Sequence, residues 1–129
     1  MDGKRIEILK SYLDVNIAKN DFIRMGIEMN KQLIGYVDLA CIKDNTAELG
    51  IAIGESLLWG KGIGFNAALN MIEYGAKKLE ITIFYAETHE TNIRCRNMLE
   101  KLGFKEISRN GFEEYLGEKE QLIQYRFDI

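Results

Sequence analysis

Three glycines alternate with other residues at the start of a helical pattern, and this run constrains the chain more than any other feature. The run is Trp59-Gly60-Lys61-Gly62-Ile63-Gly64, and apolar residues follow at helical spacing from Phe65 to Leu79. A strand-like segment, Ala47 to Gly54, lies just before it. The first turn of a helix offers unpaired backbone N–H groups to an anion, and glycine lets that anion approach the main chain. We therefore expect a phosphate-holding loop, a device that several nucleotide and coenzyme folds share.

Composition excludes several classes of protein. The 129 residues carry a net charge of -3, which argues against a nucleic-acid partner. No apolar run approaches the ~18 residues that span a bilayer, so we expect no membrane partner and no targeting core at the N-terminus. A single histidine (His89) and two distant cysteines (Cys41 and Cys95) argue against a metal site or a disulfide framework, and a cytoplasmic location is the default.

Hydrophobic periodicity predicts one domain with the order α-β-β-β-α-β-α-β-β. No linker, repeat or low-complexity segment interrupts the chain. The helices are expected at residues 4–19, Phe65–Leu79 and Asn92–Leu102. The strands are expected at Phe22–Glu28, Gln32–Ile42, Ala47–Gly54, Ile81–Glu87, Phe104–Ser108 and Leu122–Phe127, the last two joined by a polar hairpin.

Two common explanations of a glycine-rich loop fit poorly. A nucleotide P-loop needs four residues between its first glycine and Gly-Lys, followed by Ser or Thr. Here five residues separate Gly54 from Gly60-Lys61, and Gly62 follows where the hydroxyl is needed. The dinucleotide fingerprint needs Gly-x-Gly-x-x-Gly directly after a strand, and the spacing here differs, although Glu87 ends the next strand where an acidic ribose contact is expected.

The glycine run instead resembles the acyl-coenzyme A site of the GNAT family of N-acetyltransferases. Its tryptophan is typical of the branch that holds the ribosomal-protein N-terminal and spermidine acetyltransferases. Two further segments are similar to that family in the same order: Ala47 to Glu55 resembles its fourth strand, and Asn92 to Phe104 its fourth helix and the Gly-Phe entry to the next strand. The resemblance covers about residues 21 to 129 and implies an α/β (α+β) fold, with a mixed, mostly antiparallel sheet and helices on both faces.

Two departures from the family pattern affect the expected site. Only about twenty residues precede Phe22, so residues 1–20 are expected to form a reduced N-terminal helical part in which the family's first strand is missing. That would expose a sheet edge, and a second copy of the chain could cover it through the stripe Ile6, Leu9, Leu13 and Ile17. Many members also carry a general-acid tyrosine where this chain has Leu99.

The resemblance implies a set of residues that hold acetyl-coenzyme A. Backbone N–H groups of the glycine loop would bind the pyrophosphate, the fourth strand would pair with the pantetheine arm, and Asn92 would contact that arm while also capping its helix. Arg96 has a weaker case, because a solvated helix face explains it as well. The full expected set is Ile51, Ala52, Ile53, Trp59, Gly60, Lys61, Gly62, Ile63, Gly64, Phe65, Asn92 and Arg96.

Glu48 is the expected catalytic base, with Glu87 and Glu55 as runners-up. An amine must lose its proton before it attacks a thioester, and a carboxylate can take that proton. Cys95 is expected to pack rather than act as a nucleophile, because direct transfer needs no acyl-enzyme. The predicted reaction moves acetyl from acetyl-coenzyme A to a primary amine: a polyamine, small amine, amino sugar or peptide N-terminus. The alternatives are a weak or inactive coenzyme A-binding scaffold of the same fold and a nucleotide-binding module.

Overall fold

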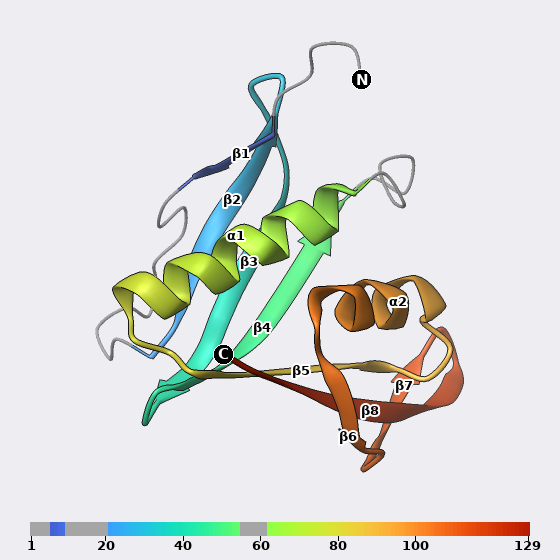
Figure 1. Ribbon diagram of the computed structural model, residues 1–129. Helices are drawn as coiled ribbons and strands as arrows, with labels where there is room; N and C mark the ends of the chain where they lie inside the picture. The colour runs from blue at the N-terminus through green and yellow to red at the C-terminus, as the bar shows by residue number, and fades with distance from the viewer. Residues whose placement is uncertain (1–5, 10–20, 55–61) are drawn as a thin grey trace.

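One mixed sheet and two helices form the domain in the computed structural model, which describes residues 6–9, 21–54 and 62–129. In chain order the described elements are β1 (Ile6–Leu9), β2 (Ile23–Met29), β3 (Gln32–Lys43), β4 (Thr46–Ile53), α1 (Ile63–Lys78), β5 (Ile83–His89), α2 (Ile93–Leu102), β6 (Lys105–Ser108), β7 (Phe112–Tyr115) and β8 (Glu118–Asp128). The strands lie in the order β1-β2-β3-β4-β5-β8-β6, and β7 pairs with β8 (Figure 1). Only the β4–β5 pair is parallel, so the predicted mixed, mostly antiparallel sheet is confirmed.

Two tight hairpins build the β2-β3-β4 meander. Asn30 and Lys31 join β2 to β3 with φ values of 53° and 64°, and Asp44 and Asn45 join β3 to β4 with φ values of 51° and 65°. Two successive left-handed residues match the twist of the flanking strands, and asparagine and aspartate tolerate that conformation better than most residues. The meander predicted from alternating apolar residues is therefore confirmed.

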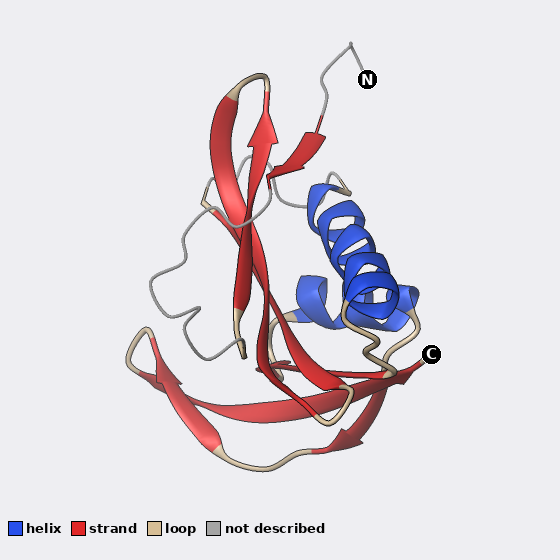
Figure 2. Cartoon of the chain, turned by 90° about the vertical axis from the view of Figure 1, so that its left-hand side faces the viewer, coloured by secondary structure: helices blue, strands red, loops and turns tan. Residues whose placement is uncertain are grey.

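A hydrophobic core fills the space between the sheet and α1. Met25 and Ile27 of β2 and Val37 and Leu39 of β3 are buried on one face, where α1 packs. The buried residues of α1 are Ile63, Ala67, Ala68, Met71, Ile72 and Gly75. Helix α2 contacts α1 and β5, and Figure 2 shows both described helices on the same side of the sheet. The expected helical cover is thus seen on one face among the described residues.

The N-terminal expectation needs correction. The helix predicted over residues 4–19 is wrong at Ile6–Leu9, which form strand β1. β1 pairs antiparallel with β2, from Ile6 opposite Met29 to Leu9 opposite Gly26. A short apolar run is ambiguous between helix and strand, and the backbone groups at the edge of β2 decide the outcome here by pairing. The expectation that the first strand is missing, which would leave the edge of β2 unpaired, is therefore also wrong, and β1 is the edge strand among the described residues. Residues 10–20 lie outside the described part.

The C-terminal region holds a strand that periodicity did not predict. Phe112–Tyr115, within the expected polar hairpin, forms β7 and pairs with residues 118–121 at the start of β8. All four β7 residues are exposed, so no apolar alternation marks them. Among the described residues, no helix is long and apolar enough to cross a membrane.

Candidate functional site

The strands β4 and β5 separate at the centre of the sheet. Their parallel pairing runs only from Thr46 opposite Ile83 to Glu48 opposite Tyr85. Beyond that point β4 continues to Ile53 with β3 as its partner, while β5 continues with β8 (Figure 1). A gap in the ladder therefore opens just after Glu48.

The β4 backbone along this gap is suited to pair with an extended ligand. Gly54 donates its N–H to the carbonyl of Ile34 on β3 at 2.8 Å. Because successive strand residues direct their backbone groups to opposite sides, Leu49 and Ile51 direct theirs toward β5. No described strand pairs with β4 on that side beyond Glu48. Backbone polar groups seek partners, so this edge is a natural place for a ligand that pairs like a strand.

The three β4 residues expected to hold coenzyme A differ in orientation. By the same alternation the backbone groups of Ile51 and Ile53 face the gap, whereas those of Ala52 face β3, where Ala52 lies opposite Tyr36. The side chains of Ile51 and Ile53 lie under the first turn of α1, near Gly64. These two residues therefore lie at the gap between β4 and β5 with their backbone and contact the first turn of α1 with their side chains.

The described part of the glycine loop begins at Gly62, which is the N-cap of α1. Its φ is 81°, in the left-handed region that favours glycine, and no side chain of the described residues caps this helix end. The N–H groups of the first turn are therefore available to an anion, as the sequence predicts. Ile63 is 3% exposed, so its side chain belongs to the core and only its backbone could serve a ligand. Trp59, Gly60 and Lys61 lie outside the described residues, as does Glu55.

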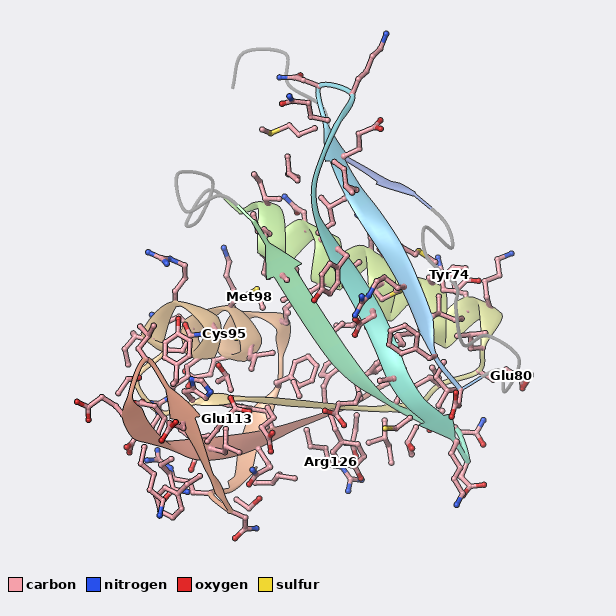
Figure 3. The ribbon with its side chains drawn as sticks, turned by 180° about the vertical axis from the view of Figure 1, so that it is seen from behind. Tyr74, Glu80, Cys95, Met98, Glu113 and Arg126 are labelled. Carbon is pink, nitrogen blue, oxygen red and sulfur yellow. The ribbon has the colours of Figure 1, made fainter. Side chains whose placement is uncertain are left out.

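Gly64 and Phe65 have packing roles that the motif alone did not reveal. A Cβ at Gly64 would lie 3.3 Å from Met98 Sδ on α2, so glycine here allows the two helices to approach. The ring of Phe65 lies 4.7 Å from Lys101 Nζ, also on α2. Gly64 and Phe65, in the first turn of α1, therefore contribute to the junction of α1 with α2. Figure 3 labels Met98 and Cys95 on α2, beside the end of β4.

The start of α2 confirms one predicted role and adds another. Asn92 is the N-cap, and its Oδ1 accepts a hydrogen bond from the Cys95 N–H at 3.1 Å. The guanidinium of Arg96 donates to Tyr125 Oη at 3.1 Å and to the Glu90 carbonyl at 2.9 Å, which ties α2 to β8. A contact of Arg96 or Asn92 with a coenzyme stays a prediction. Burial raises the pKa of the Cys95 thiol, and a hydrogen bond with Thr88 offsets part of that rise.

A pocket of about 230 Å³ lies where β4 and β5 separate. It is lined by Glu48, Tyr85, Ala86, Glu87, Ile107, Ser108, Gln124 and Tyr125. The carboxylate of Glu48 is exposed and has no hydrogen-bond or ion-pair partner among the described residues. No lysine, arginine or histidine belongs to the lining, so the pocket is acidic. An unpaired carboxylate beside a gap in the ladder is well placed to accept a proton from a cationic guest.

The sequence analysis named Glu48 and Glu87 but missed the residues that surround them. Gln124, Ser108 and Ile107 come from β8 and the end of β6, far along the chain from β4. A polar residue at an alternating strand position is the only signal that Gln124 carries, and exposed strand positions commonly show it. Strand pairing, which brings β8 beside β5 and β6 beside β8, is what assembles the pocket.

A part-buried ion pair lies on the same face of the sheet as Glu48, because strand alternation turns Asp38 and Glu48 away from the buried core face. Asp38 is 8% exposed, and its Oδ2 accepts from Arg24 Nη2 at 2.9 Å and Nε at 3.2 Å. The Arg24 guanidinium also stacks on the Tyr36 ring at 3.8 Å. Asp38 lies opposite Gly50, two residues after Glu48. No group of three or more potential metal ligands gathers within the described ranges.

Comparison with known proteins agrees with this geometry. A family model described as an acetyltransferase (GNAT) domain matches residues 4–105. The N-acetyltransferase 9-like protein of Nematostella vectensis is 36% identical over 66 residues, which are 51% of this chain and 33% of that protein. Another match spans only 17% of an uncharacterized protein of Methanocaldococcus jannaschii. The chain thus spans a third or less of the curated relatives that it matches.

Solved structures share the fold. The dodecameric spermidine N-acetyltransferase of Vibrio cholerae aligns with a TM-score of 0.79 and 24% identity, over 87% of this chain and 67% of that one. The ribosomal L7/L12 alpha-N-protein acetyltransferase RimL, solved in complex with coenzyme A, aligns with a TM-score of 0.78 and 17% identity, over 88% and 65% of the two chains. At these identities the likeness concerns the fold.

Proposed function

The chain belongs to the GNAT acetyltransferase family, and from this premise we propose that residues 1–129 form one domain that moves an acetyl group from acetyl-coenzyme A to a primary amine. The observation that carries the proposal is the separation of β4 and β5 directly after Glu48. It leaves a strand edge for the coenzyme on one side and an acidic pocket for the amine on the other. Both substrates would then meet at one point in the sheet.

The residues present fit acetyl-coenzyme A as a substrate. Its pyrophosphate would lie against the N–H groups of the first turn of α1, after Gly62, where the helix dipole favours negative charge. Its pantetheine arm would pair with the β4 backbone near Leu49 and Ile51. A β4 N–H would also polarise the thioester carbonyl and stabilise the oxyanion that forms on attack. Asn92 would contact the arm from the start of α2.

Glu48 supplies the base in this proposal. Its carboxylate takes a proton from the acceptor ammonium, directly or through water, and the free amine attacks the thioester carbon. A C–N bond forms, the C–S bond breaks, and the electron pair of that bond leaves with the sulfur. The attacking nitrogen then gives up its second proton to water, and water returns a proton to the thiolate. No residue of the chain becomes acylated. The domain contributes mainly by holding the amine and thioester in line.

The acceptor class follows only in part from the pocket. Polyamines, small amines, amino sugars and peptide N-termini are all primary amines that could reach Glu48. A lining with two glutamates and no basic residue favours an acceptor that is cationic before it reacts. Release of free thiol from acetyl-coenzyme A, measured over a panel of these amines, tests the reaction. An absence of amine-dependent release for every member would contradict it.

A second candidate is a coenzyme A-binding protein without catalysis. Leu99, which is 2% exposed, packs in the core where many family members carry a tyrosine acid. Calorimetric titration with acetyl-coenzyme A, ATP and NAD separates both candidates from a nucleotide-binding module. Binding of acetyl-coenzyme A without thiol release would favour the scaffold.

The assembly and location of the protein stay predictions. A homodimer was predicted from an exposed sheet edge, and β1 covers the edge of β2. β1 is in turn the edge strand of the described sheet. A cytoplasmic location is consistent with two cysteines that are both free thiols.

A further inference from the structure

The two glutamates of the acidic pocket have different surroundings. Glu48 has both carboxylate oxygens free of partners among the described residues. Glu87 accepts a hydrogen bond at its Oε2 from Gln124 Nε2 at 2.8 Å, while no described group contacts its Oε1. One carboxylate is therefore free to reorient, and the other is held at one oxygen.

The side chain that holds Glu87 is itself fixed on every side. Gln124 Oε1 accepts from Ser108 Oγ at 2.7 Å and from the Asn110 N–H at 2.9 Å. Its Nε2 donates to Glu87 and to the Asn110 carbonyl, at 2.8 and 2.9 Å. A carboxamide has two donor hydrogens and two acceptor lone pairs, and all four are used here. Gln124 thus locks β5, β6 and the β6–β7 connection around the pocket, in one orientation of its amide.

The negative charge of the two pocket carboxylates is not balanced by basic side chains in the lining. The pocket lining holds two carboxylates and no basic side chain. Arg126 lies over Tyr85 on the same face, but its guanidinium is paired with Asp128 at 2.7 and 3.1 Å. Two neighbouring carboxylates repel unless a cation lies between them or on each of them. A guest with one ammonium group would neutralise only one of the two.

Resting on the proposed acetyl transfer, we infer that Gln124 is a positioning residue that fixes Glu87 as the anchor for a second cationic nitrogen of the acceptor. Glu48 takes the proton from the reacting amine, and the free Oε1 of Glu87 accepts a hydrogen bond from the other nitrogen. The bond from Gln124 limits rotation of the Glu87 carboxylate, which suits an anchor. The preferred acceptor is then a diamine or polyamine, and an amine without a second positive charge binds less well.

Thiol release with two acceptors that share a four-carbon chain tests this inference: 1,4-diaminobutane, which carries two ammonium groups, and 1-aminobutane, which carries one. Glu87→Gln keeps the side-chain shape and an oxygen for the bond from Gln124, but it replaces the other carboxylate oxygen with an amide donor and removes the negative charge. We expect its KM for the diamine to rise about tenfold to a hundredfold, the range for losing a hydrogen bond to a charged group. Its kcat, and its KM for the monoamine, stay close to wild type.

Two further variants distinguish a specific effect of Gln124 on the Glu87 carboxylate from a general loss of structure or activity. Gln124→Met removes the amide at similar length, and we expect it to raise the KM for the diamine with little change for the monoamine. Glu114→Gln, on exposed β7 and outside the pocket lining, is the matched control and leaves both KM values unchanged. If Glu87→Gln or Gln124→Met raises both KM values equally, or if Glu87→Gln lowers kcat at constant KM, the anchor assignment is wrong.

A binding measurement keeps the inference separate from the proposed reaction. Calorimetric titration of each amine into the chain with coenzyme A present reports acceptor affinity without turnover. Wild type should bind the diamine more tightly than the monoamine, and Glu87→Gln should abolish that preference. Equal diamine affinity for wild type and Glu87→Gln overturns the anchor whether or not the chain transfers acetyl. Absence of thiol release from wild type with every amine contradicts the proposed function alone.

Discussion

Replacing Gly50 with alanine tests how tightly the face around Glu48 is packed. An added Cβ would lie 2.6 Å from Asp38 Oδ1, closer than real Cβ contacts allow. Asp38 cannot move freely, because it is 8% exposed and its other oxygen accepts both hydrogen bonds from Arg24. The strand must shift or the carboxylate must rotate out of the Arg24 pair.

The expected magnitude follows from three opposing effects. Alanine in place of glycine in a strand ordinarily gains about 0.5–1 kcal/mol of stability. Overpacking a filled site costs about 1–3 kcal/mol, and weakening a hydrogen bond to a charged group costs about 1.5–3 kcal/mol. The Arg24 side chain is 28% exposed, so water recovers part of the second loss. We expect a net destabilisation of about 2 kcal/mol, or a fall in Tm of roughly 6–10 °C for a domain of this size.

Thermal and urea unfolding measure the change, and Gly54→Ala is the matched control. Among the described residues, the added Cβ would meet only the Ile34 carbonyl, at 3.6 Å, which is an ordinary contact. The stability of this variant should therefore stay the same or rise slightly. In an Asp38→Ala background the clashing oxygen is gone, so Gly50→Ala should cost little. Equal stability of the Gly50 and Gly54 variants, or additive effects of the Gly50 and Asp38 changes, would refute the clash.

Three further predictions concern the site and its cysteines. Glu48→Gln removes the proton acceptor and keeps the side-chain shape, so thiol release should slow about 10²-fold. The affinity for coenzyme A, measured by calorimetry, should stay unchanged. An unchanged rate of thiol release would show that another group acts as the base. Gly62→Asp should abolish coenzyme A binding, because the added carboxylate brings both bulk and negative charge to the pyrophosphate site. Gly117→Asp, at a similar φ of 80° with open space around it, is the control and should not affect coenzyme A binding. Wild-type affinity in the Gly62 variant would contradict the proposed pyrophosphate site. Burial raises the pKa of the Cys95 thiol, so its reactive thiolate forms only at higher pH than usual. Iodoacetamide at pH 7–8 should therefore modify the exposed Cys41 before Cys95. Equal modification rates of the two cysteines, measured by peptide mass spectrometry, would contradict this prediction.

Local sequence patterns predicted most elements because each acts within a few residues. Asn92 as N-cap and Gly103 as a left-handed C-cap mark the two ends of α2. The same holds for the tight turns of the β2-β3-β4 meander and for Gly62 at the start of α1. In each case a single residue type satisfies a backbone requirement that its neighbours create.

Elements with little local signal were missed or assigned wrongly. Ile6–Leu9 can form either a helix or a strand, and its pairing with the edge of β2 decides for the strand. The exposed residues of β7 have no apolar alternation, and β8 supplies the partner that makes them a strand. Propensity could not settle either case, because the deciding hydrogen bonds join distant segments.

The sequence by itself determined the family and the meander, and it predicted a phosphate-binding glycine loop and Glu48 as the catalytic base. Only the tertiary structure decided what surrounds Glu48. Parallel pairing of β4 with β5 brings Glu48 and Glu87 to one pocket, and antiparallel pairing with β8 adds Gln124. The bond from Gln124 then gives the two carboxylates different partners, because it reaches Glu87 and not Glu48. Their difference arises from contacts across three strands, and the spacing of residues along the chain does not encode such contacts.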